Sequence, residues 1–179
     1  MLIKAEKSTL LVVDIQEKLA GVMNGIDQVV GNTSILMKSA QQLSIPQLVS
    51  EQYPKGLGAT LGRLSELSNS APIEKLSFSC MDNDDYVSRF NALGREQAVI
   101  AGMEAHVCVL QTAMDLLHRD VQVFVVADAT TSRSPDSHSM ALHRLSGAGA
   151  EIVTTEMVVF EWLGRAGTPQ FRELSKLIK

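Results

Sequence analysis

The feature that most constrains the fold is an alternation of short apolar runs with longer segments of helical periodicity. The apolar runs are STLLVVDI, IPQLVSEQ, QAVIAG, VQVFVVAD and EIVTT. Because these runs are almost continuously apolar, they suit strands that are covered on both faces. Apolar residues recur at helical spacing in residues 26–43 and 107–118, and again from Ser137 to an end at Gly147 or Gly149. The alternation predicts a three-layer α/β fold, in which helices cover both faces of a parallel sheet.

The length of the chain fits one domain. A chain of 179 residues is long enough to bury a core without metals or disulfides. No internal repeat, low-complexity tract or linker interrupts it, so we expect a single domain over residues 1–179. The glycine-containing stretch PKGLGATLG lacks the Lys-Ser/Thr ending of a phosphate loop. We interpret it as a loop inside this domain.

Composition and charge exclude several classes of partner. Hydrophobic residues make up 45% of the chain and charged residues 20%, which is typical of a globular protein. No apolar run reaches the roughly 18 residues of a membrane span, and the amino terminus lacks the pattern of a signal peptide. We therefore expect a cytoplasmic protein with no membrane partner. The 16 Lys and Arg against 20 Asp and Glu give a net charge of −4, and without a basic stripe we expect no nucleic acid partner.

Three residues follow or flank predicted strands, at the edge where parallel sheets bind their ligands. Asp14 ends LLVVD, Lys75 lies in PIEKLSFSC, and Cys108 lies where a helix begins after AVIAG. The free N–H groups and dipole of a helix N-terminus favour a thiolate, so Cys108 is a candidate nucleophile. Each residue also has an ordinary interpretation, as a helix cap, a solvated lysine and a buried apolar thiol respectively.

The order and context of LLVVDIQEKL, KLSFSC, VIAGMEAHVCVLQTAMDL and VVADATTSRS resemble the isochorismatase-like cysteine hydrolases, which include nicotinamidases and N-carbamoylsarcosine amidohydrolase. EQYPKGLG and GMEAHVCV look closest to the branch of isochorismatase domain-containing proteins. The resemblance implies a Rossmann-like fold with a six-stranded parallel sheet, and it places the family's catalytic triad on Asp14, Lys75 and Cys108. It also implies a cis peptide between Met103 and Glu104, and an oxyanion hole made by the backbone N–H groups of Glu104 and Cys108.

The same resemblance implies a cysteine hydrolase that cleaves a small amide or related C–N bond. Asp14 would accept the thiol proton, and Cys108 would attack the carbonyl to give a thioester. The positive charge of Lys75 would favour the ionised forms of both. Two alternatives stay open: vinyl-ether hydrolysis of isochorismate, and a non-catalytic binding or scaffold protein that keeps the fold.

The metal motif of nicotinamidases is not reproduced. Their Asp-x-His pair would fall on Gln52 and Pro54, and an amide and a proline are poor ligands for zinc or iron. We predict no metal and no other cofactor. Leu19 stands where nicotinamidases carry an aromatic residue that stacks on the pyridine ring, which argues against nicotinamide as substrate.

The remaining predictions concern the pocket and the assembly. The substrate is expected to be a small molecule, and the chain is expected to form a homo-oligomer, as a dimer, tetramer or larger ring. The residues assigned to the pocket are Gln16, Leu19, Tyr53, Phe78 and Ala105.

Three further residues have a structural and a functional interpretation. Cys80 is interpreted as a buried apolar residue, with a redox partnership with Cys108 as the alternative. Trp162 is assigned to the core, and only an exposed position would indicate a subunit contact. His106 is assigned a surface or capping role, or else a place at the border of the pocket.

Overall fold

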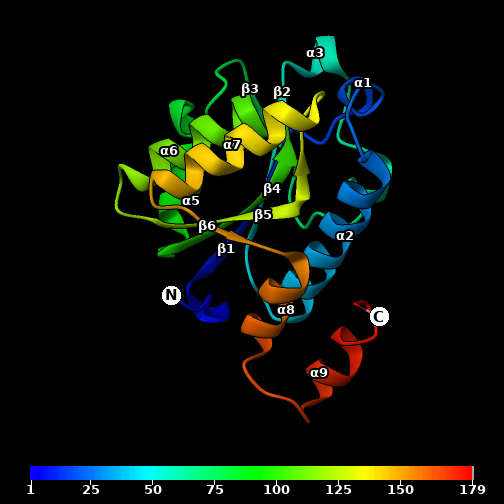
Figure 1. Cartoon of the computed structure of the whole chain (residues 1–179). Helices are drawn as coiled ribbons and strands as arrows, with labels where there is room; N and C mark the ends of the chain where they lie inside the picture. Colours follow the sequence, from blue (N-terminus) through cyan, green and yellow to red (C-terminus); the bar gives the residue numbers. More distant parts are fainter. Residues whose placement is uncertain (179) are drawn as a thin grey trace.

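The computed structural model describes residues 1–178, and its strands form one six-stranded sheet with the order β3-β2-β1-β4-β5-β6 (Figure 1). Every neighbouring pair of strands is parallel, which confirms the predicted α/β fold class. The strands are β1 (Ser8–Val13), β2 (Gln47–Gln52), β3 (Ile73–Lys75), β4 (Gln97–Met103), β5 (Gln122–Thr131) and β6 (Glu151–Val153).

Helices cover both faces of this sheet. In Figure 1, α6 and α7 lie on one face, and α2 and α8 lie on the other. No helix within residues 1–178 is both long enough and apolar enough to cross a bilayer. The helical segments are η1 (Ala5–Lys7), α1 (Glu17–Ala20), α2 (Ile26–Gln42), α3 (Pro54–Leu57), α4 (Gly62–Ser65), η2 (Cys80–Asp82), α5 (Asp84–Ala92), the π-helical turn η3 (Ala105–Val109), α6 (Leu110–Leu117), α7 (Pro135–Gly147), α8 (Thr155–Leu163) and α9 (Pro169–Leu174).

The central strand β1 shows why the apolar runs are continuous. All six of its residues are buried, because alternate side chains enter different cores. Leu10 and Val12 pack into the core that includes α2 and α8. Leu11 and Val13 pack into the core that includes α5, α6 and α7. A strand buried on both faces can carry no polar stripe, which is the physical origin of the sequence pattern.

The sixth strand, β3, has no apolar run of its own. It is three residues long, and only Ile73 and Lys75 are buried, whereas Glu74 is exposed. Just beyond it, residues 76–79 form an irregular loop that leads into η2. Parallel pairing of β3 with β2 places Lys75 opposite Gln52.

The late tryptophan belongs to the core, as the sequence indicated. Trp162 is 5% exposed, and its indole Nε1 donates a hydrogen bond to Ser8 Oγ at 3.1 Å. Cys80 is fully buried, in agreement with the interpretation of this thiol as an interior residue.

Gly102 allows β4 to pass close to the end of β1. A Cβ at this position would lie 2.4 Å from the carbonyl oxygen of Val13 and 2.7 Å from its Cβ. These distances are below van der Waals contact, so any side chain would force the two strands apart just before Asp14.

We expect Gly102→Ala to lower the free energy of unfolding by about 2 kcal/mol, as for other overpacked interior sites. Gly31→Ala is the matched control, because Gly31 lies inside α2 with no atom within 4 Å of the added Cβ. Because alanine has a higher helix propensity than glycine, the Gly31→Ala variant should be about 1 kcal/mol more stable than the wild type. Urea unfolding measures both. A Gly102→Ala protein as stable as the wild type would contradict the close approach.

Candidate active site

The three candidate catalytic residues meet at the carboxyl edge of the sheet. Asp14 directly follows β1, Lys75 is the last residue of β3, and Cys108 lies in η3, the turn that follows β4. Asp14 has a φ of 52°, so the backbone turns away from the strand at this residue. Asp14 is fully buried, and Lys75 and Cys108 are 2% and 5% exposed.

Asp14 and Lys75 form a buried ion pair. Lys75 Nζ lies 2.8 Å from Asp14 Oδ2, and the two side chains are 0% and 1% exposed. The second carboxylate oxygen, Oδ1, accepts a hydrogen bond from Ser50 Oγ at 2.7 Å. Both oxygens of Asp14 therefore have a donor, as a buried carboxylate requires.

The ammonium of Lys75 has four oxygen neighbours. Besides Asp14 Oδ2, it donates to Gln52 Oε1 at 2.8 Å and contacts the carbonyls of Ser77 and Phe78 at 3.2 and 3.1 Å. Burial acts to lower the pKa of Lys75, but the charge of Asp14 and the hydrogen bond to it hold the pKa above its ordinary value. Lys75 is thus a fixed positive charge with no free proton to offer a ligand.

Burial, and after it the negative charge of Asp14, raises the pKa of the Cys108 thiol above its ordinary value. Lys75 acts in the opposite direction but does not outweigh them. The thiol is therefore protonated in the resting site at neutral pH. The helix N-terminus and Lys75, which the sequence indicated as favouring the thiolate, act against this cost of placing a charge in a buried site.

The turn between β4 and α6 differs from the prediction in its peptide geometry. No peptide bond within residues 1–178 is cis, and the bond between Met103 and Glu104 is trans. The chain reverses instead through Glu104, which has φ 55° and ψ 59°. The left-handed conformation of this residue gives the chain its change of direction between β4 and η3.

The side chain of Glu104 connects this turn to the loop after β5. Its carboxylate lies 2.7 Å from Arg133 Nε and 3.3 Å from His106 Nδ1. His106 Nδ1 also lies 2.9 Å from Ser132 Oγ, and the His106 side chain is 27% exposed. His106 therefore belongs to a polar cluster beside the turn that carries Cys108.

Two of the predicted pocket residues are completely buried. Gln16 is 0% exposed, and its amide hydrogen-bonds to the backbone of Gln52 and to the carbonyl of Gly58. Ala105 is also 0% exposed. Leu19 is partly buried and packs against the core on the α2 face.

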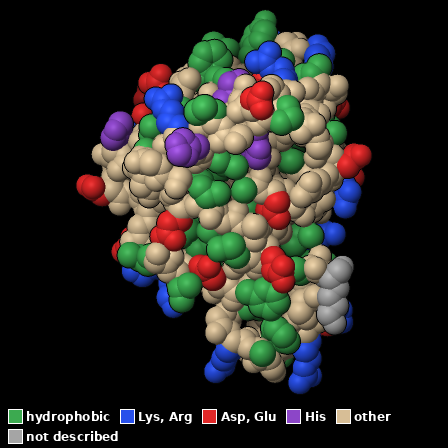
Figure 2. All heavy atoms as spheres, in the orientation of Figure 1, with side chains coloured by type: hydrophobic (Ala, Val, Ile, Leu, Met, Phe, Trp, Pro, Cys, Tyr) green, Lys and Arg blue, Asp and Glu red, His purple; other side chains and the backbone are tan. Residues whose placement is uncertain are grey.

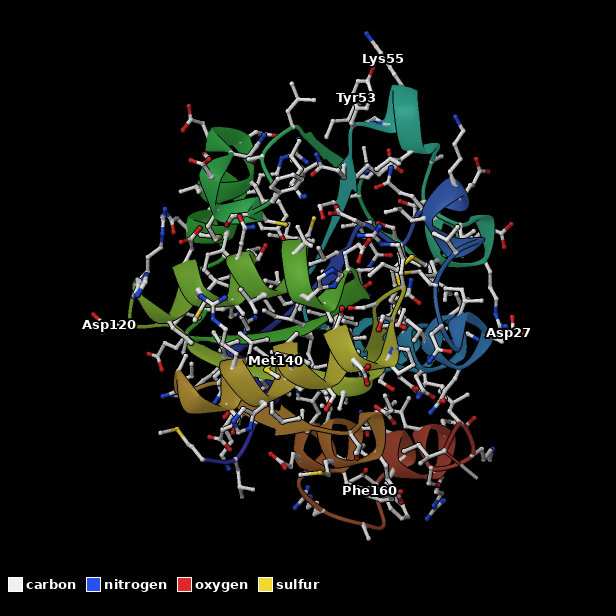
Figure 3. All side chains as sticks on the ribbon, turned by 45° about the horizontal axis from the view of Figure 1, so that its top comes forward. Asp27, Tyr53, Lys55, Asp120, Met140 and Phe160 are labelled. Carbon is white, nitrogen blue, oxygen red and sulfur yellow. The ribbon has the colours of Figure 1, made fainter. Side chains whose placement is uncertain are left out.

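The other two predicted pocket residues are half exposed. Tyr53 projects outward from the turn where α3 begins (Figure 3) and, with Lys75, lines a cavity of about 530 Å³ beside β3. Phe78 lines a neighbouring cavity of about 620 Å³ together with Asp115. Tyr53 and Lys75 therefore line one cavity. The five predicted pocket residues do not all line the same cavity.

Sequence reasoning missed Ser50 as a partner of Asp14, and it considered Gln52 only as a poor metal ligand. Both lie at the carboxyl end of β2, and the one signal for them was the polar triplet SEQ at the end of an otherwise apolar run. Cys80 is connected to the same group, because its Sγ lies 3.5 Å from Ser50 Oγ. In the described part of the chain, no three His, Cys, Asp or Glu side chains are grouped to hold a metal.

Comparison with known proteins identifies the family. Residues 8–157 match the isochorismatase domain. The chain belongs to the isochorismatase family. Isochorismatase domain-containing protein 2 of Danio rerio is 39% identical over 172 residues, which cover 96% of this chain and 86% of that protein. The secreted isochorismatase effector Isc1 of Phytophthora sojae is 36% identical over 96% of this chain and 84% of its own. Since this family includes a protein named as secreted, the cytoplasmic location stays a prediction.

Solved structures of similar chains share the same architecture. The MAR1 ribonuclease of Caenorhabditis elegans superposes with a TM-score of 0.93 at 38% identity, covering 99% of this chain and 92% of that one. The ycaC gene product of Escherichia coli, an octameric hydrolase of unknown specificity, gives a TM-score of 0.93 at 25% identity over 99% and 90% of the two chains. The shared architecture therefore extends over 99% of this chain.

The charges around Cys108 predict opposite effects for the two members of the ion pair. Asp14→Asn removes the carboxylate that raises the thiol pKa, so iodoacetamide should label Cys108 faster at neutral pH. Lys75→Met removes the charge that lowers this pKa, so labelling should be slower. Each change should be about tenfold, corresponding to one pKa unit, in rates measured by mass spectrometry.

Asp115→Asn is the matched control, because Asp115 lies on the neighbouring helix α6 and bonds to Ser79 Oγ rather than to the ion pair. Breaking a buried pair costs about 3 to 5 kcal/mol, so the labelling rates are compared only for protein shown to be folded by circular dichroism. Equal rates in the Asp14 and Lys75 variants would refute this electrostatic description.

Proposed function

We propose that this chain is a metal-independent cysteine hydrolase that cleaves a small amide or related C–N bond. The observation that carries the proposal is the buried Asp14–Lys75 ion pair at 2.8 Å, next to a thiol whose pKa responds to both charges. A buried ion pair of this kind is weak evidence for stability. Its position at the ligand-binding edge of a parallel sheet favours a catalytic purpose.

The first half-reaction forms a thioester. Asp14 takes the proton from the Cys108 thiol, and the sulfur attacks the carbonyl carbon of the bound amide. The carbonyl oxygen becomes an oxyanion, and the backbone N–H groups of Glu104 and Cys108 are the proposed donors to it. Collapse of this intermediate breaks the C–N bond, and the protonated Asp14 gives its proton to the leaving nitrogen.

The second half-reaction releases the acid. Asp14, now ionised again, takes a proton from water, and the resulting hydroxide attacks the thioester carbonyl. The C–S bond breaks, and the thiolate of Cys108 recovers the proton from Asp14. Lys75 keeps its proton throughout, and its role is to hold Asp14 in place and to stabilise the negative charge on sulfur.

The support for a C–N bond comes from the nucleophile and from the nature of the family. A thiol that forms an acyl intermediate suits amide-type carbonyls, whereas vinyl-ether hydrolysis needs no acyl acceptor. The ycaC gene product is itself named as a hydrolase of unknown specificity. Gln52 and Pro54, at the positions considered for metal ligands, support the metal-independent form of the chemistry.

We expect Cys108→Ala to lower turnover of any cleaved amide by at least about 10³-fold, since removal of a nucleophile eliminates the acyl pathway. A panel of small amides is screened for released amine, and the wild-type thioester is trapped in acid and located by peptide mass. The alanine variant must show no trapped adduct. Amide turnover that survives in this variant would contradict the proposed nucleophile.

A ribonuclease activity, suggested by the name of the Caenorhabditis elegans relative, is the competing assignment. Acidic and basic side chains are interspersed on the face seen in Figure 2, and the chain carries a net charge of −4, which is a poor match for a polyanion. The panel therefore includes a single-stranded RNA and isochorismate. Cleavage of either one that is unaffected by Cys108→Ala would replace the amide assignment.

We also propose that the chain forms a homo-oligomer. Support comes from the octameric ycaC gene product and from large apolar side chains exposed near the end of β3, where Leu76 is 75% and Phe78 53% exposed. Light scattering during size-exclusion chromatography should give a multiple of 19.4 kDa. A single species at the monomer mass over a wide concentration range would contradict this proposal.

A further inference from the structure

We propose that Gln52 is a positioning residue that holds the Lys75 ammonium beside Asp14, and that Gln16 in turn holds Gln52. This inference rests on the proposed hydrolase function and extends it by one layer of residues. Neither glutamine is assigned contact with the reacting atoms. Both act through the lysine.

The side chain of Gln52 bridges the end of β3. Its Oε1 accepts a hydrogen bond from Lys75 Nζ at 2.8 Å. Its Nε2 donates to the carbonyl of Leu76 at 2.8 Å. The first contact fixes the charged end of Lys75 and the second fixes the backbone that follows it. One amide therefore links the ammonium of Lys75 to the backbone that follows its strand.

Gln16 fixes the backbone of Gln52 from the opposite side. Its Oε1 accepts from Gln52 N at 2.7 Å, and its Nε2 donates to the carbonyl of Gln52 at 3.0 Å. The chain leaves the direction of β1 at Asp14, so no backbone of β1 is available at this level of the sheet. The amide of Gln16 takes the place of a strand residue and continues the hydrogen-bond ladder to β2.

A neutral acceptor at this position matters for the thiol. Lys75 has three N–H donors, and its two short contacts, at 2.8 Å, are to Asp14 and Gln52. Gln52 restrains the ammonium without adding negative charge near Cys108. A carboxylate in its place would restrain the lysine equally well but would raise the pKa of the thiol.

The titratable groups that affect Cys108 come from several elements. Asp14 follows β1, Lys75 ends β3 and Cys80 begins η2, and all three influence the pKa of Cys108. Glu104 and His106 lie on the same turn as the thiol. An uncharged replacement of Gln52 alters none of these groups directly, so its effect on Cys108 must pass through Lys75.

The test is the pH profile of Cys108 labelling by iodoacetamide, followed by peptide mass so that Cys80 is counted separately. Gln52→Met keeps the length of the side chain but removes the acceptor. We expect about tenfold slower labelling at a fixed pH below the midpoint, the size expected for one hydrogen bond to a charged group. The midpoint should move to higher pH, because a loosely held ammonium stabilises the thiolate less.

Gln47→Met is the matched control. Gln47 lies at the other end of β2, is 8% exposed and donates its side-chain amide to the carbonyl of Met37 at 3.0 Å. Loss of this buried hydrogen bond should lower the free energy of unfolding, as loss of the Gln52 hydrogen bonds does. The midpoint of Cys108 labelling should stay at its wild-type pH. An equal displacement in both variants would show a merely structural effect and overturn the inference.

Gln52→Asn keeps the inference testable if the methionine variant does not fold. Its amide adds no charge but is one methylene too short to keep the hydrogen bond to Lys75 Nζ, so the labelling midpoint should again move to higher pH. A wild-type profile in this variant overturns the inference.

The labelling assay needs no substrate, so a displaced profile without cleavage of any amide supports the positioning role while rejecting the hydrolase proposal. Amide turnover with an unmoved labelling profile would support the hydrolase proposal and reject the positioning role.

Discussion

The buried ion pair between Asp14 and Lys75 is the interaction on which the organisation of this site depends. Removing both charges from water costs several kcal/mol per ion, which the attraction between them offsets only if the remaining donors and acceptors are satisfied. Ser50 satisfies the second oxygen of Asp14, and Gln52 with two loop carbonyls surrounds Lys75. The carboxyl ends of β1, β2 and β3 are thus coupled through one pair of charges.

Much of the fold follows from local sequence pattern. Five of the six strands coincide with largely apolar runs, because strands covered on both faces need mostly apolar side chains. The strand β3 escaped this reasoning for a physical reason: it is three residues long with Glu74 exposed, so its identity comes from pairing with β2. Its parallel pairing, which brings Lys75 toward the site, is a long-range property that no local pattern encodes.

The order of strands and helices along the sequence predicts only part of the candidate site. The sequence pattern placed Asp14 at the end of a strand and Cys108 at the start of a helix, whereas the choice of Lys75 as their partner came from the family resemblance. The partners Ser50 and Gln52 depend on the register between neighbouring strands and on the orientation of single side chains. The turn at Glu104 is a similar case, because the side chain of Glu104 pairs with Arg133 from the loop after β5, a contact that no local pattern encodes.

A protonated resting thiol is compatible with nucleophilic chemistry once the total charge of the site is counted. Asp14 and Lys75 cancel, so loss of the Cys108 proton to solvent would leave one uncompensated negative charge in a buried environment. Transfer of that proton to Asp14 instead gives a thiolate, an ammonium and a neutral carboxyl, and the net charge stays zero. The carboxylate that suppresses ionisation at rest is therefore the group that permits it during the reaction. Reactivity is confined to the step in which the proton moves inside the site.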